Sequence, residues 1–209
     1  MVRVKICGIT NPNDARLCAE LGAHAIGLNF YPESPRAISP FDAEKIIRDL
    51  PPFISTVGIF VNWLPQAVIA LSAALRLNFA QLHGDETSQL VGKVAKKIPV
   101  IKALRLPPGG RLPDFAAYKA ASAFLLDAAK AGDFGGTGQF TDWLLAQKAS
   151  RSHRIILAGG LTPVNVGAAI TSVRPYAVDV ASGVESRPGI KDPDKLRAFF
   201  DQVHLADQP

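Results

Sequence analysis

The feature that most constrains the fold is a series of short, apolar, β-branched segments that recur along the chain at a nearly even spacing. Gly, Pro, Asn or Asp bounds each one, as is typical of strands buried in a parallel sheet. The eight segments are residues 2–6, 25–30, 54–61, 79–82, 100–104, 123–126, 155–158 and 176–180. Over 209 residues this leaves about 26 residues for each strand and its following connection.

Helical segments with N-terminal capping signals lie between these strands. Asn11-Pro12 places a side-chain cap and a first-turn proline before an apolar face that stops at Gly22. Three further pairs repeat the same start signal, namely Ser39-Pro40, Thr162-Pro163 and Asp192-Pro193. We therefore expect a helix after each strand.

Eight strands alternating with eight helices predict one (β/α)₈ barrel of nearly minimal size, a single domain over residues 1–209. A doubly wound open sheet is the alternative. Such a sheet usually has fewer strands and a glycine fingerprint after the first one. Here the first turn reads Cys7-Gly8-Ile9-Thr10, so the barrel is the better interpretation.

Composition narrows the classes of partner. The net charge is +5, but the 23 Lys and Arg residues are scattered, so we expect small anions to bind and no nucleic acid. No apolar run is long enough to cross a membrane, and residues 1–6 form a strand pattern and not a secretion signal, which predicts a cytoplasmic protein. Cys7 and Cys18 match neither a disulfide framework nor a zinc site, and we expect no metal. A monomer and a homodimer both remain open.

Reactive groups in such barrels lie where strands end and the following loops begin. One thiol, Cys7, and one carboxylate, Asp127, stand at these positions, and Gly-rich turns follow the last two strands. Backbone N–H groups in such turns can hold a phosphate. The full set of strand-end positions is Cys7, Asn29, Asn62, His83, Arg105, Asp127, Gly159-Gly160 and Ser182-Gly183.

An ordered set of motifs resembles phosphoribosylanthranilate isomerase from residue 4 to about residue 192. The departures are small: Ala181 stands where a second serine is expected, and Asn29 replaces a more apolar residue. The motifs are Val4-Lys5-Ile6-Cys7-Gly8-Ile9-Thr10, Phe30-Tyr31-Pro32-Glu33-Ser34-Pro35-Arg36, Val57-Gly58-Ile59-Phe60-Val61-Asn62, Gln81-Leu82-His83-Gly84-Asp85, Leu125-Leu126-Asp127, Gly135-Gly136-Thr137-Gly138, Leu157-Ala158-Gly159-Gly160-Leu161-Thr162-Pro163 and Val178-Asp179-Val180-Ala181-Ser182-Gly183-Val184-Glu185.

The resemblance implies an Amadori rearrangement in tryptophan biosynthesis that needs no cofactor. N-(5-phosphoribosyl)anthranilate would become 1-(2-carboxyphenylamino)-1-deoxyribulose 5-phosphate, with Asp127 as general acid and Cys7 as general base. It also implies that Arg36 binds the anthranilate carboxylate, for which a planar guanidinium is suited. His83 is expected to line the pocket, and the alternative is that it supports its loop. Asp179 shares strand parity with Ala177 and Ala181, so it should point into the barrel top close to the substrate. Gly159, Gly160, Ser182 and Gly183 are expected to bind the phosphate.

Two further expectations concern the surroundings of Cys7. Lys5 lies two residues before Cys7 on the same strand face, so it should also point into the barrel, where Asp179 or Asp127 would pair with it. Its charge would favour the thiolate; the alternative is that Lys5 reaches out of the barrel's bottom. Residues 128–138 form a long loop that we expect to act as a lid over the ligand.

Two other functions compete with this interpretation. One is another phosphoribosyl isomerase, such as that of histidine biosynthesis, a family that uses aspartates for both roles and has duplicated phosphate sites. Cys7 and the lack of a matching Gly-rich turn after the third and fourth strands disfavour it. The other is a non-catalytic barrel that binds a phosphosugar, which the presence of both Cys7 and Asp127 disfavours.

Overall fold

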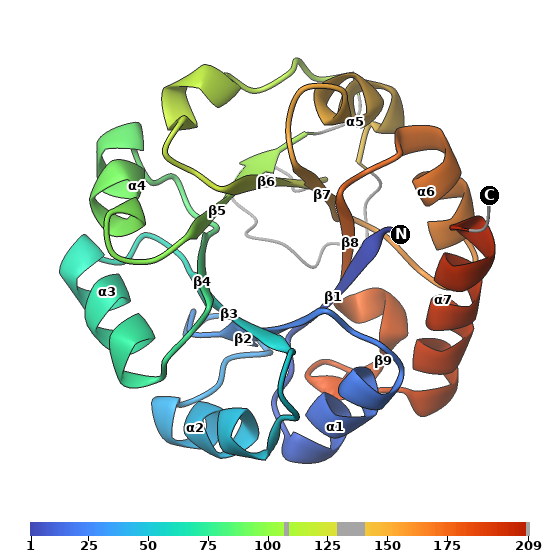
Figure 1. The fold of residues 1–209 in the computed structure, drawn as a ribbon, viewed down its shortest axis with the longest axis horizontal. Helices are drawn as coiled ribbons and strands as arrows, with labels where there is room; N and C mark the ends of the chain where they lie inside the picture. The colour runs from blue at the N-terminus through green and yellow to red at the C-terminus, as the bar shows by residue number, and fades with distance from the viewer. Residues whose placement is uncertain (107–108, 129–140, 208–209) are drawn as a thin grey trace.

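The structure is a computed structural model that describes residues 1–106, 109–128 and 141–207. Its parallel strands form a closed barrel in chain order, and β8 pairs with β1 to complete the ring (Figure 1). This confirms the (β/α)₈ architecture, and each strand matches the sequence prediction to within one residue at either end. The strands are β1 (Arg3–Cys7), β2 (Ala25–Asn29), β3 (Ser55–Phe60), β4 (Phe79–Leu82), β5 (Val100–Arg105), β6 (Ala123–Asp127), β7 (Ile155–Leu157) and β8 (Ala177–Val180).

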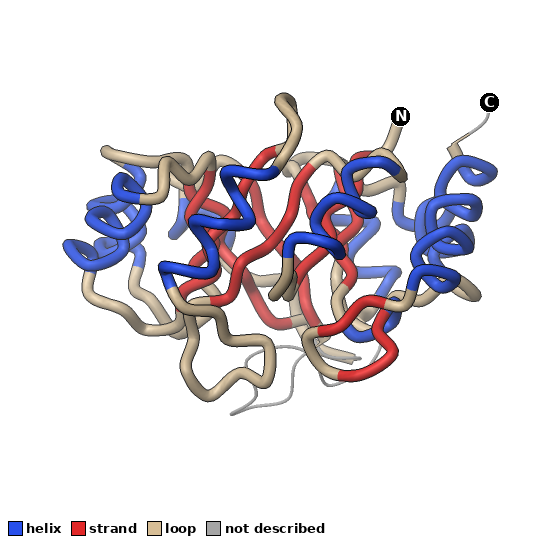
Figure 2. The backbone as a smooth tube through the Cα atoms, turned by 90° about the horizontal axis from the view of Figure 1, so that it is seen from below, coloured by secondary structure: helices blue, strands red, loops and turns tan. Residues whose placement is uncertain are grey.

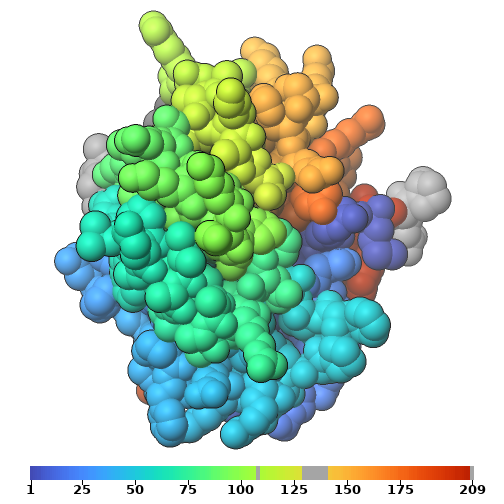
Figure 3. Space-filling model, turned by 60° about the vertical axis from the view of Figure 1, so that its left-hand side comes forward, coloured from blue at the N-terminus to red at the C-terminus, as the bar shows by residue number. Residues whose placement is uncertain are grey.

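Helices surround the barrel, and Figure 3 shows the outer face that the region of α3 and α4 forms, in cyan and green. In the described part of the chain there are seven α-helices and not the eight expected, because the connection after β5 holds only the 3₁₀-helix η1 (Phe115–Tyr118). The α-helices are α1 (Pro12–Glu20), α2 (Pro40–Asp49), α3 (Pro65–Ala74), α4 (Ser88–Ala95), α5 (Trp143–Ser150), α6 (Val166–Val173) and α7 (Pro193–Ala206). None of the described helices is long and apolar enough to cross a membrane.

Three of the four expected caps are confirmed. Asn11, Ser39 and Asp192 each accept a hydrogen bond from a backbone N–H in the first turn of the helix that follows. The prediction at Thr162-Pro163 is wrong, because α6 begins at Val166. The side chain of Asn165 accepts a hydrogen bond from the Thr162 N–H at 2.8 Å, which keeps this segment in a turn.

Alternating side chains divide the apolar residues into two layers. On β6, Ala123 and Leu125 belong to the small cluster inside the barrel, whereas Phe124 and Leu126 belong to the larger layer between barrel and helices. The period of two along each strand produces this division. A strand residue two positions from an interior residue therefore also points inward.

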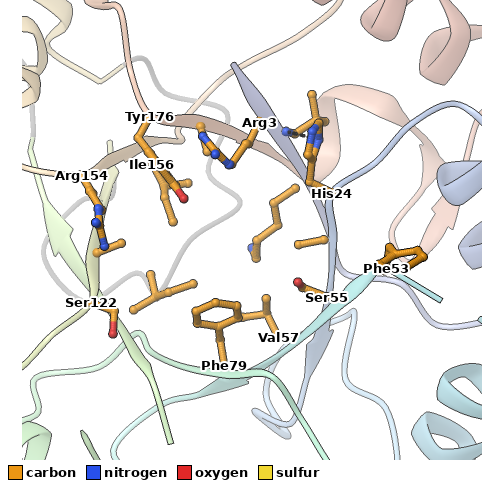
Figure 4. Close-up of a pocket in the computed structure, with 16 residues that line it drawn as sticks. Arg3, His24, Phe53, Ser55, Val57, Phe79, Ser122, Arg154, Ile156 and Tyr176 are labelled. Carbon is orange, nitrogen blue, oxygen red and sulfur yellow. Dashed lines mark hydrogen bonds between the residues drawn. The ribbon is translucent and has the colours of Figure 1, made fainter. Parts of the chain in front are cut away.

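A cavity of about 360 Å³ opens at the N-terminal end of the barrel. Val57, Phe79 and Ile156 project into it, and Arg3 and Arg154 lie at its edge (Figure 4). The sequence-predicted acid and base, Cys7 and Asp127, are not among its lining residues. This cavity is therefore not where the expected chemistry would take place.

The opposite, C-terminal end of the barrel carries the loops that follow the strands. After β8 come the 3₁₀-helix η2 (Ser182–Val184) and a small antiparallel hairpin of β9 (Glu185–Arg187) and β10 (Ile190–Lys191). Figure 2 shows this hairpin at the end of the barrel away from the two chain termini. The hairpin was not predicted from the sequence.

Candidate active site

Cys7 and Asp127 are the last residues of β1 and β6, at the C-terminal end of the barrel. Asp127 follows the interior residues Ala123 and Leu125 in the two-residue period, so its carboxylate points into the barrel mouth. The fold thus brings one thiol and one carboxylate to the same end of the barrel, as expected from their positions in the sequence.

Asp127 is held by its neighbours. Its Oδ1 accepts a hydrogen bond from the Ala128 N–H at 2.8 Å, and its Oδ2 lies 3.4 Å from Nε2 of His83. The other ring nitrogen of His83 is 2.8 Å from Nε2 of Gln81, which fixes the plane of the imidazole. His83 therefore lies against the carboxylate that we expect to act as the acid.

Lys5 points into the barrel, as its position two residues from Cys7 predicts. Its Nζ donates to Oδ1 of Asp179 at 2.7 Å, and both side chains are buried. The strand register makes this contact, because Lys5 on β1 pairs directly with Asp179 on β8. The alternative in which Lys5 leaves through the bottom of the barrel is wrong.

The charges around Cys7 act on its pKa in opposite directions. Burial raises the pKa of the Cys7 thiol, the ammonium groups of Lys5 and Lys191 lower it, and Asp179 raises it, with a net upward result. Burial lowers the pKa of Lys5, but Asp179 and Cys7 more than offset this, so its net pKa is raised and it stays charged. Lys5 therefore favours the thiolate without fully compensating for burial.

Space for the thiol comes from a glycine on the neighbouring strand. A Cβ at Gly27 of β2 would lie 2.9 Å from Sγ of Cys7 and 3.0 Å from Cδ1 of Ile59. These distances are shorter than ordinary contacts, so any larger residue would displace the sulfur or its neighbour. Sequence reasoning did not identify Gly27, because its role appears only when the strand register is known.

The two Gly-rich turns after β7 and β8 line one small cavity of about 50 Å³. Gly159 and Gly160 both have positive φ, of 83° and 66°, which glycine adopts readily. Within the described residues, no backbone carbonyl accepts a hydrogen bond from the N–H groups of Gly160, Leu161 or Gly183. The lining is Asp127, Ala158, Gly159, Gly160, Leu161, Asp179, Val180, Ala181, Ser182 and Gly183.

Close packing of the two turns explains why Gly183 is a glycine. A Cβ there would lie 1.9 Å from the carbonyl oxygen of Leu161, so a side chain would separate the turns. Asn165 supports the first turn, since its amide donates to the Gly160 carbonyl at 2.9 Å. The shape of this cavity therefore depends on contacts between loops that are far apart in the sequence.

Arg36 lies in the loop after β2, with its stem against Gly8. A Cβ at Gly8, whose φ is 73°, would be 2.5 Å from Cδ of Arg36. The guanidinium donates from Nε and Nη2 to the two carboxylate oxygens of Glu185, at 2.9 and 2.7 Å. Glu185 and its further partner Lys191 were not predicted as site residues, although both lie close to sequence signals, after the Ser182-Gly183 turn and before the Asp192-Pro193 cap.

The expected lid and the unusual residue Asn29 also belong to this end of the barrel. Residues 129–138 of the expected lid lie outside the described residues. Asn29, the unusual residue at the end of β2, accepts from the Tyr31 N–H at 2.9 Å and donates to Oγ of Ser34 at 3.0 Å. It thereby shapes the loop that carries Arg36. The described residues contain no group of His, Cys, Asp or Glu side chains arranged to hold a metal.

Comparisons with known proteins agree on one family. Residues 4–202 match the family model for N-(5'phosphoribosyl)anthranilate (PRA) isomerase. The N-(5'-phosphoribosyl)anthranilate isomerase of Trichlorobacter lovleyi is 52% identical over 201 residues, which are 96% of this chain and 97% of that protein. This similarity covers nearly the whole of both chains.

Solved structures of the same family are also similar to this one. The phosphoribosyl anthranilate isomerase of Thermotoga maritima has a TM-score of 0.88 and 43% identity, over 98% of this chain and 100% of that chain. A second structure from that organism is of monomers generated from the dimeric isomerase. A phosphoribosyl anthranilate isomerase in complex with reduced 1-(o-carboxyphenylamino)-1-deoxyribulose 5-phosphate has a TM-score of 0.83 and 41% identity, over 98% of this chain and 100% of that chain.

Proposed function

The chain belongs to the N-(5'-phosphoribosyl)anthranilate isomerase family, and from this membership we propose that Cys7 and Asp127 carry out its reaction as general base and general acid. The protein is an isomerase of tryptophan biosynthesis. It converts N-(5'-phosphoribosyl)anthranilate to 1-(2-carboxyphenylamino)-1-deoxyribulose 5-phosphate.

The rearrangement begins with two proton transfers, and a third proton reaches C1 when the enolamine becomes the ketone. Asp127 donates a proton to the furanose ring oxygen as the C1–O bond breaks, which gives an open-chain Schiff base. Cys7, as the thiolate, then takes the proton from C2, and the resulting enolamine tautomerises to the ketone. The observation that supports these roles most directly is that Cys7 and Asp127 end their strands at the same rim of the barrel, where Asp127 also lines the cavity of about 50 Å³.

The two ends of the substrate carry different anions. The N–H groups of Gly160, Leu161 and Gly183, to which no described backbone carbonyl is hydrogen-bonded, support a phosphate site at the turns after β7 and β8. At the other end, Arg36 binds the anthranilate carboxylate. His83, which lies against Asp127, and Asp179, which lines the cavity at the Gly-rich turns, contact the part of the substrate between its two anions. Gly159 and Ser182 also line the cavity in which the phosphate would bind. Phosphorylated sugar is thus the ligand of this end of the barrel.

Two broader proposals concern the protein in the cell. The protein acts in the cytoplasm, where amino-acid biosynthesis takes place, and its assembly is a monomer or a homodimer. A dimeric isomerase among its relatives supports the second of these. Light scattering at several protein concentrations separates them, since a dimer has twice the mass of the 22.3 kDa chain.

Substitution of the proposed base and acid tests their roles. Cys7→Ser and Asp127→Asn should each lower kcat by about 100-fold or more, because a hydroxyl is a far poorer base than a thiolate and an amide cannot donate a proton as an acid does. The KM should change much less in both variants. The loss of anthranilate fluorescence on turnover of freshly made substrate provides the assay.

Cys18→Ser is the matched control for Cys7→Ser. Cys18 is a fully buried thiol on α1, outside the site, so its replacement should reduce stability and leave kcat within about threefold. Retention of wild-type kcat in Cys7→Ser or in Asp127→Asn would refute the corresponding role. A protein that bound the product but turned over no substrate would instead be the non-catalytic barrel.

A further inference from the structure

Arg36, Glu185 and Lys191 form a cluster of three charged side chains with little exposure to solvent. Glu185 of β9 accepts from Arg36 with both carboxylate oxygens, and its Oε1 also accepts from Nζ of Lys191 at 3.0 Å. The exposed fractions of the side chains are 12% for Arg36, 4% for Glu185 and none for Lys191. Two cations and one anion leave the cluster with one excess positive charge.

The hydrogen-bonding capacity of Lys191 is fully used. Besides Glu185, its Nζ donates to the carbonyl oxygens of Cys7 at 2.7 Å and Ala181 at 3.1 Å. An ammonium group has three N–H donors, and all three are therefore taken. Lys191 joins the end of β1, the end of β8 and the carboxylate of Glu185, and it has no donor left for a ligand.

Glu185 is similarly occupied. It accepts from Arg36 and Lys191, and the Gly189 N–H lies 3.4 Å from its Oε1. Burial raises the pKa of Glu185, but its contacts with Arg36 and Lys191 lower the pKa by more than burial raises it. The net pKa is therefore below its usual value, and the carboxylate is charged. Glu185 is thus a fixed carboxylate that holds one edge of the guanidinium, and Lys191 anchors it.

The unused capacity of the cluster lies on the other edge of Arg36. Nε and Nη2 donate to Glu185, which uses two of the five guanidinium N–H groups. In the described part of the chain, the remaining N–H groups, on Nη1 and Nη2, have no acceptor. This second edge has the spacing that accepts a carboxylate through two parallel hydrogen bonds. Because Glu185 faces the opposite edge, the excess positive charge of the cluster is least compensated at the Nη1–Nη2 edge.

We propose that Glu185 and Lys191 are positioning residues that make Arg36 selective for a carboxylate ligand. Glu185 holds the Nε–Nη2 edge, Gly8 supports the stem, and the Nη1–Nη2 edge faces the aromatic carboxylate of the substrate. Lys191 neutralises Glu185 and anchors the hairpin to Cys7 and Ala181. This inference rests on the proposed role of Arg36 in binding that carboxylate.

The opposite arrangement is also chemically reasonable and makes the proposal testable. If Glu185 competed with the substrate for Arg36, the removal of its charge would strengthen carboxylate binding. If Glu185 positions Arg36, the same change lets the guanidinium rotate away and weakens carboxylate binding. The two models therefore predict changes of opposite sign for Glu185→Gln.

The experiment compares two ligands that differ by one carboxylate. The first is reduced 1-(o-carboxyphenylamino)-1-deoxyribulose 5-phosphate, and the second is its phenylamino analogue without the ring carboxylate. Calorimetry gives the ratio of their Kd values for wild type and for Glu185→Gln. We expect a wild-type ratio of roughly 10 to 100 in favour of the carboxylate, typical of charge-assisted hydrogen bonds, and a ratio near 1 in Glu185→Gln.

The analogue without the carboxylate should bind wild type and Glu185→Gln with Kd values within about threefold of each other. A merely structural role of Glu185 would instead weaken both ligands equally and leave the ratio unchanged, which overturns the proposal. A larger ratio in Glu185→Gln overturns it in favour of competition. Lys191→Met should also lower the ratio. An unchanged ratio in this variant would show that Lys191 does not position Arg36.

Two more variants separate the inference from its premise. Arg36→Met should bring the ratio near 1; if it does not, Arg36 does not bind the carboxylate and the proposed function of that residue fails. If Arg36→Met loses the ratio but Glu185→Gln keeps it, only the inference fails. Glu86→Gln is the matched control, since Glu86 is a buried glutamate paired with Lys102 at 2.8 Å elsewhere on the rim, and its ratio should equal that of wild type.

Discussion

At the scale of single residues, the strand period accounts for much of the site. Lys5 and Cys7 share one face of β1, and the register of β1 with β8 places Asp179 opposite Lys5. The inward direction of all three follows from their spacing along the chain, so their proximity could be predicted from the sequence. The resulting charge arrangement lowers the pKa of the thiol through Lys5 and raises it through Asp179.

Substitutions of these two charges should move the pKa of Cys7 in opposite directions. Lys5→Met removes a group that favours the thiolate, so the acidic limb of the kcat/KM profile should move to higher pH by about half a unit or more. Asp179→Asn removes a group that disfavours the thiolate and should move the limb to lower pH. Wild-type profiles are the reference, and far-UV circular dichroism verifies the fold.

A readout independent of turnover tests the assignment of this limb to Cys7. In a Cys18→Ser background, the rate of alkylation by iodoacetamide rises with the thiolate fraction of Cys7. Its midpoint should shift as the kcat/KM limb does in each variant. Shifts of the same sign in Lys5→Met and Asp179→Asn would contradict this account of the charges.

The strand period does not predict the cluster of Arg36, Glu185 and Lys191. Arg36 and Glu185 are 149 residues apart, and both the loop after β2 and the hairpin after β8 lack a strand or helix period that would fix their direction. The contact depends on loop geometry, which short-range patterns in the sequence do not determine. Loops therefore set the limit of what the sequence predicts about the site.

At the scale of elements, the sequence predicts best those features that depend on neighbouring residues, namely the strands and the helix caps. Eight strand segments and three caps were confirmed, because burial and capping act within a few residues. After β5 the described residues hold η1 and not the expected α-helix; the Asp114 side chain accepts from the Ala117 N–H, and this short turn ends at Tyr118. At Thr162, the Asn165 side chain takes the backbone donor, and α6 starts later.

A titrating cap gives an element-scale prediction. Asp142 accepts from the Leu145 N–H at the start of α5, and this bond lowers the pKa of Asp142 below its usual 3.8. A carboxyl group with a lowered folded-state pKa stabilises the fold above its usual pKa, and this contribution disappears as the pH falls through the folded-state value. Asp142→Ala should therefore lower the free energy of unfolding by about 1 kcal/mol at pH 7 and by progressively less below about pH 4.

Thr87→Ala is the matched control for this measurement. Thr87 caps α4 with a hydroxyl group that accepts from the Leu90 N–H at 3.3 Å and does not titrate in this range. Its cost should be similar at pH 7 and the same at every pH where both proteins fold. Urea unfolding at several pH values measures both differences, and a constant cost for Asp142→Ala would show that its charge plays no part in the cap.

At the scale of the whole molecule, the barrel closes only when the two ends of the chain meet. β1 pairs with β8, and the Val2 N–H donates to Asp207 Oδ1 at 3.0 Å, just beyond α7. Figure 2 shows both termini at the same end of the barrel. A closed ring leaves no strand edge exposed, so the loss of any one strand or its covering helix affects every other strand.

Two leucines on α7 test this dependence with the same substitution. Leu196 is fully buried and Leu205 is 60% exposed, so the same replacement on one helix compares a buried with an exposed side chain. Leu196→Ala should lower the free energy of unfolding by about 2–5 kcal/mol through lost burial and a cavity, whereas Leu205→Ala should change it by less than about 0.5 kcal/mol. For a chain of this size the first change corresponds to a fall in Tm of at least about 4 °C.

The closed ring further predicts how Leu196→Ala unfolds. Because α7 contacts α6 and η2 while β8 completes the barrel, local loosening at α7 should open the whole ring and not one segment. Thermal curves from far-UV circular dichroism and from residual activity should therefore shift together and remain single transitions. An activity loss well below the circular dichroism transition would show that α7 and the C-terminal rim unfold separately from the rest of the barrel.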